Sequence, residues 1–180
     1  MTAMKSKRMR SKSNNLLART LVPSLLAGFT IALLVSVLSY LRVDLAYGTG
    51  TSLVIFTSFA SSIFIMFLMP RSIAAKSGKF VKSYVIAGII GYVGSLGLVF
   101  MPLAAVAGLV VFVLALAMIA THSEHPPAAA IAFAFVLFKV GIIGILVIAL
   151  GIMVILAVRF SLERFVFRFE KALGERQTAK

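Results

Sequence analysis

Six consecutive polar or helix-breaking residues interrupt the most apolar part of this chain, and both of its histidines lie among them. The six residues are His122, Ser123, Glu124, His125, Pro126 and Pro127. An apolar run, Leu103–Ala120, precedes them and another, Ala128–Phe138, follows. Proline lacks a backbone N–H and is accommodated in the first turn of a helix but not in its interior. The sequence therefore predicts one helix that ends near Thr121 and a second that begins at Pro126.

The residue types in this break suit the binding of an anion. The start of a helix at Pro126 presents unpaired N–H groups and a partial positive charge, which attract negative charge. His125 titrates near physiological pH, and Glu124 can carry a proton or pair with a base. Ionisable groups at membrane depth are functional candidates. The predicted anion site consists of His122, Glu124, His125, Pro126 and Pro127.

Two other interpretations of the break stay open. It is a solvated turn whose prolines do no more than start a helix, or it is a metal site. His122, Glu124 and His125 offer three ligands, but the chain has no cysteine and no third histidine to complete a tetrahedral set. We therefore predict neither a bound metal nor a cofactor.

The composition is that of an integral membrane protein. Of the 180 residues, 61% are hydrophobic and 13% are charged, whereas soluble domains have about 45–50% and about 25%. Five stretches approach or exceed the roughly 18–20 apolar residues that span a bilayer. They are Leu21–Leu41, Leu53–Met69, Tyr84–Met101, Leu103–Ala120 and Val140–Phe160. The sequence predicts an all-α, polytopic membrane helix bundle in which Ala128–Phe138 is a shorter sixth segment.

The net charge of +13 is concentrated between the apolar stretches. Basic residues gather in a leader (1–19), in the segment Arg71–Lys82 and in the tail after Arg159. Loops rich in Lys and Arg stay on the cytoplasmic side, so we expect a multi-pass cell-membrane protein with both termini cytoplasmic. Because topology explains the charge, we predict no nucleic-acid partner. The first apolar segment is expected to be a retained helix, since no small-residue cleavage site follows it.

The same charge order bears on the number of spans. The break and the tail are both predicted inside, so the chain must cross an even number of times between them. Two helices of about 17 residues each, joined by a turn at Lys139, Gly141 and Gly144, satisfy this. The total is then six spans, which can form two inverted halves of three. One long helix, Pro126–Phe160, is the alternative and gives five spans.

The predicted domains are the leader (1–19), the transmembrane bundle (20–160) and a tail (161–180). Phe165, Phe169 and Leu173 recur every four residues in the tail, which predicts an amphipathic helix at the membrane surface.

Hydroxyl side chains are concentrated in the second apolar stretch. They are Thr57, Ser58, Ser61 and Ser62. In the inverted-halves arrangement this stretch corresponds to the one that begins at Pro126, so we predict that the hydroxyls face the anion site. The alternative is that small residues there only let helices pack closely. The row Gly88, Gly91, Gly94 and Gly97 is assigned to packing for that reason.

The segment Ala115–Ala130, which contains His125-Pro126-Pro127, resembles the signature of the HPP family of integral membrane proteins. Thr57–Ser62 and Met69–Ala75 are similar to that family's small-residue span and to the loop after it. The resemblance covers Leu53–Phe138 and implies a transporter, because some plastid and cyanobacterial members are implicated in nitrite transport. The chain departs from the family at Ala60 and Ala129, where glycine is usual.

These observations predict a membrane transporter or channel for a small inorganic anion of the nitrite kind. The expected partners are the lipid bilayer, the anion and further copies of the chain in a homo-oligomer. The alternative is a non-transporting assembly or receptor subunit whose basic tails bind anionic lipid. An enzyme is not predicted, because no nucleophile motif is present. A cavity that reaches both the break and the hydroxyls would favour transport.

Overall fold

The computed structural model describes the backbone of residues 2–41 and 43–178, and the side chains of residues 21–41, 50–161 and 164. This part of the chain forms α-helices and two short 3₁₀ helices, and no strand. The α-helices are α1 (Thr2–Tyr40), α2 (Val43–Leu68), α3 (Ser77–Leu96), α4 (Leu103–Ala120), α5 (Pro127–Phe138) and α6 (Ile143–Thr178). The 3₁₀ helices are η1 (Ile73–Ala75) and η2 (Gly97–Val99). The predicted all-α helix bundle is confirmed.

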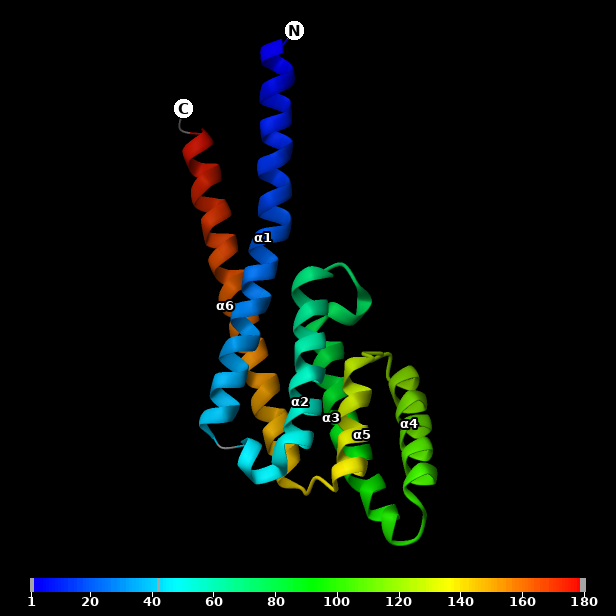
Figure 1. Cartoon of the computed structure of the whole chain (residues 1–180). Coiled ribbons are helices and arrows are strands. Elements are labelled where there is room, and N and C mark those ends of the chain that lie inside the picture. Colours follow the sequence, from blue (N-terminus) through cyan, green and yellow to red (C-terminus); the bar gives the residue numbers. More distant parts are fainter. Residues whose placement is uncertain (1, 42, 179–180) are drawn as a thin grey trace.

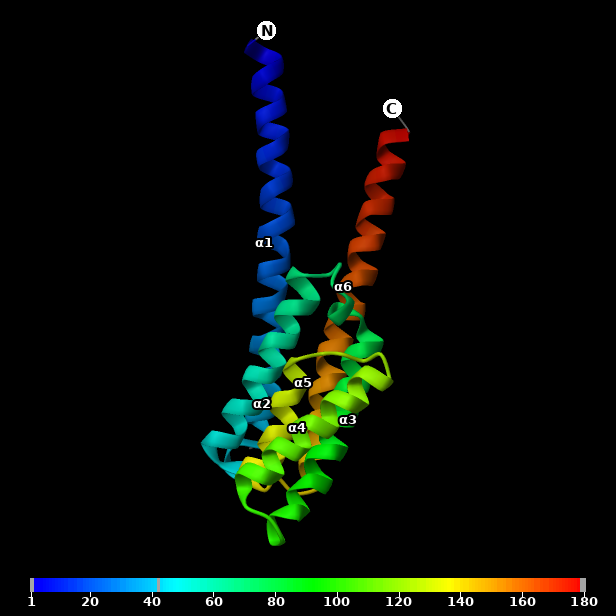
Figure 2. The ribbon, with the colours of Figure 1, turned by 90° about the vertical axis from the view of Figure 1, so that its right-hand side faces the viewer.

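Successive helices alternate in direction through the bundle (Figure 1). As a result α1 begins, η1 lies and α6 ends toward the same end of the molecule, which we call the basic end (Figure 2). Helices α1 and α6 continue beyond the rest of the bundle there, so the leader and the tail are continuous with them. The side chains proposed to make the tail amphipathic lie outside the described residues.

Within the part of the chain that the structure describes, five helices are long and apolar enough to cross a membrane. Their spanning segments are Leu21–Tyr40, Gly50–Leu68, Ser77–Val99, Leu103–Ala120 and Ile143–Ser161. The chain turns between α5 and α6, so the alternative of a single helix from Pro126 to Phe160 is wrong. The prediction of two helices of about 17 residues is also wrong, because α5 has 12 residues and α6 has 36.

Helix α5 is shorter than the hydrocarbon core of a membrane. At about 1.5 Å per residue its 12 residues cover about 18 Å, well short of the roughly 30 Å hydrocarbon core. At least one end of α5 must therefore lie below the membrane surface. Both ribbon views show the α4–α5 connection nearer the middle of the bundle than the α2–α3 connection (Figures 1 and 2). The break that precedes α5 is thus set back from the end of the bundle at which the α2–α3 connection lies.

The break forms as the prolines predict, and its geometry explains where α4 stops. His122 has a left-handed backbone with φ of 50°. This brings the Ser123 N–H onto the Met118 carbonyl at 2.9 Å, a bond that closes the C-terminus of α4. At the other end of α5, Lys139 has φ of 51° and the Val140 N–H donates to the Phe135 carbonyl. Each left-handed non-glycine residue costs about 1 kcal/mol.

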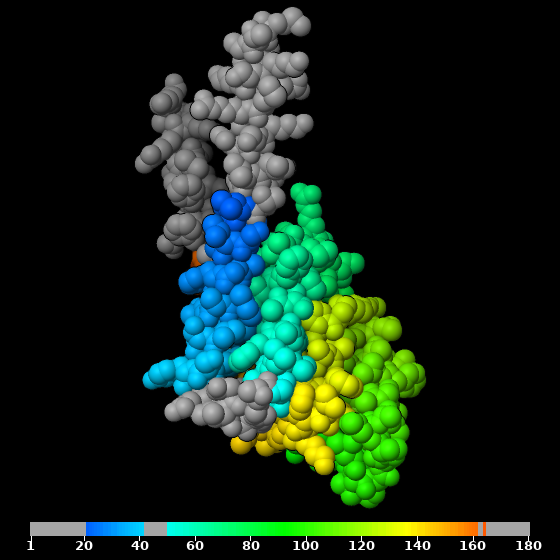
Figure 3. All heavy atoms as spheres, viewed as in Figure 1, coloured from blue at the N-terminus to red at the C-terminus, as the bar shows by residue number. Residues whose placement is uncertain are grey.

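Helix α5 is the centre of the packing. On one face of the molecule it lies between α2 and α4 (Figure 3), and its backbone touches α3 at Gly91. A Cβ placed on Gly91 would lie 2.7 Å from the Ala132 Cα and 2.9 Å from the Ala132 carbonyl oxygen. The space that a Cβ on Gly94 would need is likewise occupied, by the side chain of Val110 of α4. The assignment of this glycine row to helix packing is therefore confirmed at these two positions.

The outside of the bundle is apolar. Leu25, Phe112 and Leu146 are each at least 60% exposed, and many other large apolar side chains share this environment. An exposed apolar surface of this extent fits contact with lipid rather than with water.

Candidate functional site

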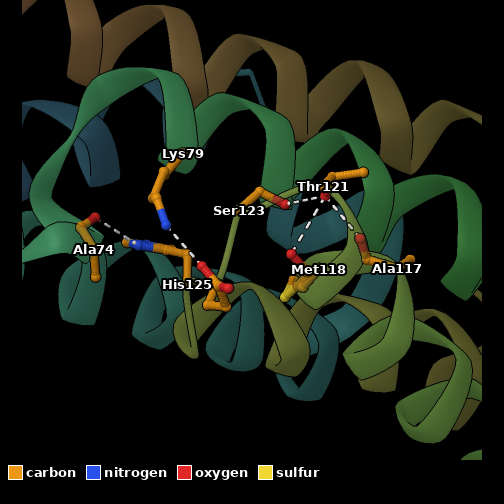
Figure 4. A network of polar contacts seen from close by, with 8 residues as sticks. Ala74, Lys79, Ala117, Met118, Thr121, Ser123 and His125 are labelled. Atoms are coloured by element: carbon orange, nitrogen blue, oxygen red, sulfur yellow. Dashed lines mark hydrogen bonds and ion pairs between the residues drawn. The ribbon is translucent and has the colours of Figure 1, made fainter.

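His125 is fully buried and is held through both of its ring nitrogens. Its Nε2 lies 2.8 Å from the Oγ of Ser62 on α2. Its Nδ1 lies 3.0 Å from the carbonyl oxygen of Ala74 in η1 (Figure 4). A carbonyl oxygen only accepts, so Nδ1 carries a proton and donates. The loop after α2 and the break after α4, far apart in the sequence, are therefore joined at this side chain.

The hydrogen bonds continue from Ser62 toward the start of α5. The hydroxyl of Tyr84, on α3, lies 2.7 Å from the Ser62 Oγ and 2.8 Å from the Ser58 Oγ. Ser58 then donates to the carbonyl oxygen of Pro127 at 2.6 Å. We call this set the His125 network. It consists, in order, of the Ala74 carbonyl, His125, Ser62, Tyr84, Ser58 and the Pro127 carbonyl.

Aromatic rings enclose the network and keep water from it. Phe59 stacks on Tyr84 with ring centroids 5.0 Å apart and an interplanar angle of 9°. Phe80 meets His125 in a T-shaped contact at 5.6 Å. All four of these side chains are at most 1% exposed. Polar groups in so dry a site interact more strongly than in water, and an unpaired one there is costly.

The structure brings together only some of the predicted site residues. Ser58, Ser62, His125 and Pro127 belong to the network, but Thr57 and Ser61 are exposed on a different face of α2. The Thr57 hydroxyl donates to the Leu53 carbonyl of its own helix at 2.9 Å. Residues four apart lie on one helix face, so 58 and 62 share a face that 57 and 61 cannot. The prediction that Thr57 and Ser61 face the site is wrong for this reason.

Three other predicted residues also lie outside the network. His122 and Pro126 are exposed, and His122 acts through its backbone at the end of α4. Glu124 is exposed and pairs with Lys79 of α3, with Nζ and Oε2 2.7 Å apart. The hydrogen bond from Lys79 lowers the pKa of Glu124 below its ordinary value. This pair joins the break to α3 on the outside of the helix bundle, whereas His125 is buried inside it.

Four contributors were missed from the sequence. Tyr84 stands at the first position of a predicted apolar stretch, and its type alone gives no sign that its hydroxyl faces inward. Ala74 contributes only a carbonyl, and no side-chain pattern reveals a carbonyl. In the sequence, Lys79 and Arg159 serve only to predict which loops are cytoplasmic. In the structure, Arg159 of α6 donates to the Ala75 carbonyl. Adjacent carbonyls of η1 are thus held by His125 and by Arg159.

Burial determines the charge state of His125. Loss of hydration lowers its pKa below the ordinary value, and the hydrogen bond to Ala74 offsets part of this change. The imidazole is consequently neutral at pH 7, since its ordinary pKa is already about 6.5.

A cavity of about 230 Å³ lies beside the break. Besides Glu124, His125 and Pro126, its lining is apolar and comes from α4 and α5, including Leu114 and Met118. Neither Ser58 nor Ser62 lines it. The break and the hydroxyls are instead joined by direct hydrogen bonds. Elsewhere, Ser123 and Thr121 share a hydrogen bond at the end of α4 (Figure 4).

Metal ligation finds no support in the described residues, where no three His, Cys, Asp or Glu side chains are grouped as ligands. Among known proteins, residues 13–169 of the chain match the family described as HPP, transmembrane region. A search of curated proteins gave no match, and neither did a search of solved structures.

Proposed function

The chain belongs to the HPP family of integral membrane proteins, and on that premise we propose that it carries a small inorganic anion across the membrane. The observation that carries the proposal is the buried His125 network at the junction of α2, α3 and α5. A bundle held only by packing has no need of an ionisable side chain at depth, where such groups are costly and usually functional.

The groups of the network are suited to an anion of the nitrite kind. Ser58, Ser62 and Tyr84 each have a hydroxyl donor, and the imidazole of His125 has one or two N–H donors. In the structure these donors are engaged by one another and by the carbonyls of Ala74 and Pro127. When the helices separate, the same donors would face a shared space at the N-terminus of α5, whose partial positive charge favours anions.

The arrangement of α2 and α5 supports a transport cycle. They are the second helices of the two proposed inverted halves, and Ser58 of α2 is bonded to Pro127 of α5. Inverted halves commonly place a substrate site between corresponding interrupted or shortened helices near the midplane. Helix α5 is short, and we expect the break before it to lie within the membrane, as such a site requires.

One observation favours a second function. Helices α1 and α6 continue beyond the bundle at the basic end (Figure 1), and the sequences there are rich in Lys and Arg. A non-transporting subunit that binds anionic lipid or a partner through these extensions would not need the His125 network to open.

A measurement of nitrite flux distinguishes the two functions. The full chain is reconstituted in liposomes, and nitrite uptake is followed against protein-free liposomes, which correct for diffusion of neutral nitrous acid. His125→Ala should abolish the protein-dependent uptake, whereas His122→Ala should retain most of it because His122 is exposed. Pro126→Ala should do less harm than His125→Ala, since alanine also permits a helix to start. Uptake by His125→Ala at the wild-type rate would remove the assignment of the site.

A further inference from the structure

The His125 network has fewer protons than hydrogen bonds when His125 is neutral. Its five links join Ala74 to His125, His125 to Ser62, Ser62 to Tyr84, Tyr84 to Ser58 and Ser58 to Pro127. The three hydroxyls supply one proton each and a neutral imidazole supplies one. Both terminal carbonyls supply none. Four protons therefore serve five links, whichever ring nitrogen is protonated.

A doubly protonated imidazole removes this deficit. The Nδ1–H then donates to Ala74 and the Nε2–H donates to Ser62. Ser62 donates to Tyr84, Tyr84 donates to Ser58, and Ser58 donates to Pro127, so that every link holds one proton and every donor has an acceptor. Ser62 also lies 3.1 Å from the Ser58 carbonyl. With this sixth link counted, the neutral network has four protons for six links and the doubly protonated network has five, so proton uptake still reduces the deficit by one.

We propose that the His125 network is a proton-binding site, which takes up one proton from water at the imidazole of His125, and that the proton is the ion coupled to transport. The proton-binding role stands on the geometry alone, whereas the coupling role rests on the proposed function. Uptake adds one positive charge at the junction of α2, α3 and α5, where an anion would need a counter-charge.

The charged groups around His125 do not exclude an added positive charge on the imidazole. From α3, Lys79 faces the break but is paired with Glu124, and Tyr84 is part of the network itself. Arg159 of α6 donates to the Ala75 carbonyl, and α2 contributes only the two serines. In the break, Glu124 precedes His125 directly, and both Glu124 and His122 are exposed. Among the described side chains the nearest full negative charge is thus Glu124, next in the chain.

Burial lowers the proton affinity of the imidazole, whereas the hydrogen-bond network raises it. Desolvation lowers the pKa of His125, but each proton acceptor left without a proton in the neutral state favours uptake. Removal of any one hydroxyl deletes two links and one proton. Of the five links, three then remain with three protons, so these links are balanced in the neutral state. In Ser58→Ala the contact of Ser62 with the carbonyl of residue 58 persists, so the deficit falls from two protons to one and the incentive to bind a proton is weakened.

This difference makes Ser58→Ala diagnostic. Ser58 does not touch His125, yet its loss should lower the proton affinity of the imidazole. The full chain is prepared in nanodiscs with ¹⁵N-labelled histidine and the substitution His122→Asn, which leaves a single imidazole; asparagine tolerates the left-handed backbone at this position. The protonation of both ring nitrogens is then followed by NMR from pH about 8 to about 5.

We expect both nitrogens to become protonated on acidification, and the midpoint to fall by about one pH unit in Ser58→Ala. Ser61→Ala, the same substitution on the exposed face of α2, should leave the midpoint unchanged. Tyr84→Phe repeats the test should Ser58→Ala fail to fold. Equal midpoints in Ser58→Ala and Ser61→Ala, or an imidazole that stays singly protonated while the protein is folded, would overturn the proton-binding site.

A second arm separates this inference from the proposed function. Nitrite uptake by proteoliposomes is measured with and without an inward acid gradient, again corrected by protein-free liposomes. Acceleration by the gradient in the wild type, weakened in Ser58→Ala but not in Ser61→Ala, supports coupling. Protein-dependent uptake that ignores the gradient overturns coupling and leaves anion transport standing. A normal His125 titration without any uptake overturns the transport proposal and leaves the proton site standing.

Discussion

Ser62 and His125 are 63 positions apart in the chain, and their Oγ and Nε2 atoms lie 2.8 Å apart in a site where neither residue is exposed. This contact joins the hydroxyl-rich face of α2 to the break before α5. Because Ser62 also contacts the Tyr84 hydroxyl at 2.7 Å, one side chain connects three parts of the bundle. Its position makes Ser62 the most sensitive test of the network.

Ser62→Ala should destabilise the protein. The substitution leaves Nε2 of a fully buried imidazole without its partner, and an unsatisfied buried polar group costs about 1–3 kcal/mol. Thermal unfolding in detergent, followed by circular dichroism, should show a lower midpoint than the wild type. Ser61→Ala is the matched control, because Ser61 is exposed and surface changes of this kind stay within about 0.5 kcal/mol. Equal midpoints for the two variants would mean that the network contributes nothing to stability.

Gly91→Ala should separate α3 from α5. The added methyl would lie 2.7 Å from the Ala132 Cα, and backbone cannot move aside as a flexible side chain can. Overpacking of this kind costs about 1–3 kcal/mol. Gly108→Ala in α4 is the control, since nothing lies within 4 Å of the Cβ there and alanine favours a helix over glycine by up to about 1 kcal/mol. We expect opposite shifts of the unfolding midpoint, and shifts of the same sign would contradict the close approach of α3 to α5.

Acid should destabilise the wild type through His125. The pKa of His125 is lowered in the folded state, so below its ordinary value of about 6.5 the unfolded chain binds a proton that the folded chain binds less well. Stability is therefore complete above about pH 6.5 and falls as the pH drops from there toward the folded pKa. His125→Gln has no group that titrates at this position. Its unfolding midpoint should fall less than that of the wild type between pH about 7 and about 5.

The sequence predicts the break but not its partners. Two prolines after an apolar run require a helix to end and another to begin, and local chemistry alone places this near residue 126. The hydroxyls of α2 are different. Thr57 with Ser61, and Ser58 with Ser62, are equivalent pairs at a spacing of four, and only the rotation of α2 against α3 and α5 decides which pair is buried.

The contributions of Tyr84 and Ala74 to the network could not be predicted from the sequence for a related reason. Each acts through one polar group, a phenol hydroxyl or a backbone carbonyl, whose direction is set by tertiary packing. The turn predicted at Lys139 is confirmed by its left-handed backbone. The length of about 17 residues expected for each helix came from dividing the stretch 126–160 equally between two crossings, and the structure instead gives 12 residues to α5 and 36 to α6. Charge order predicts an even number of passages between the break and the tail, and it carries no information on how deep each turn lies.

The last prediction concerns whether α5, which has 12 residues, carries the chain across the membrane. Gly78 at the start of α3 and Gly141 between α5 and α6 lie toward opposite ends of the bundle (Figure 1). A Cβ on either glycine meets nothing within 4 Å, and the chain has no native cysteine. Single cysteines at these two positions should therefore be tolerated and labelled without ambiguity.

In sealed vesicles, Gly78→Cys and Gly141→Cys should react with a membrane-impermeant maleimide from opposite sides, with Gly78→Cys on the cytoplasmic side because Arg71, Lys76, Lys79 and Lys82 surround it in the sequence. The physical basis is that the roughly 18 Å covered by α5 suffices if the break before it lies within the membrane and local thinning accommodates the rest. Labelling of both cysteines from one side would mean that α5 enters and leaves by the same face. The break would then be a surface feature, and a buried His125 could not serve a path across the bilayer.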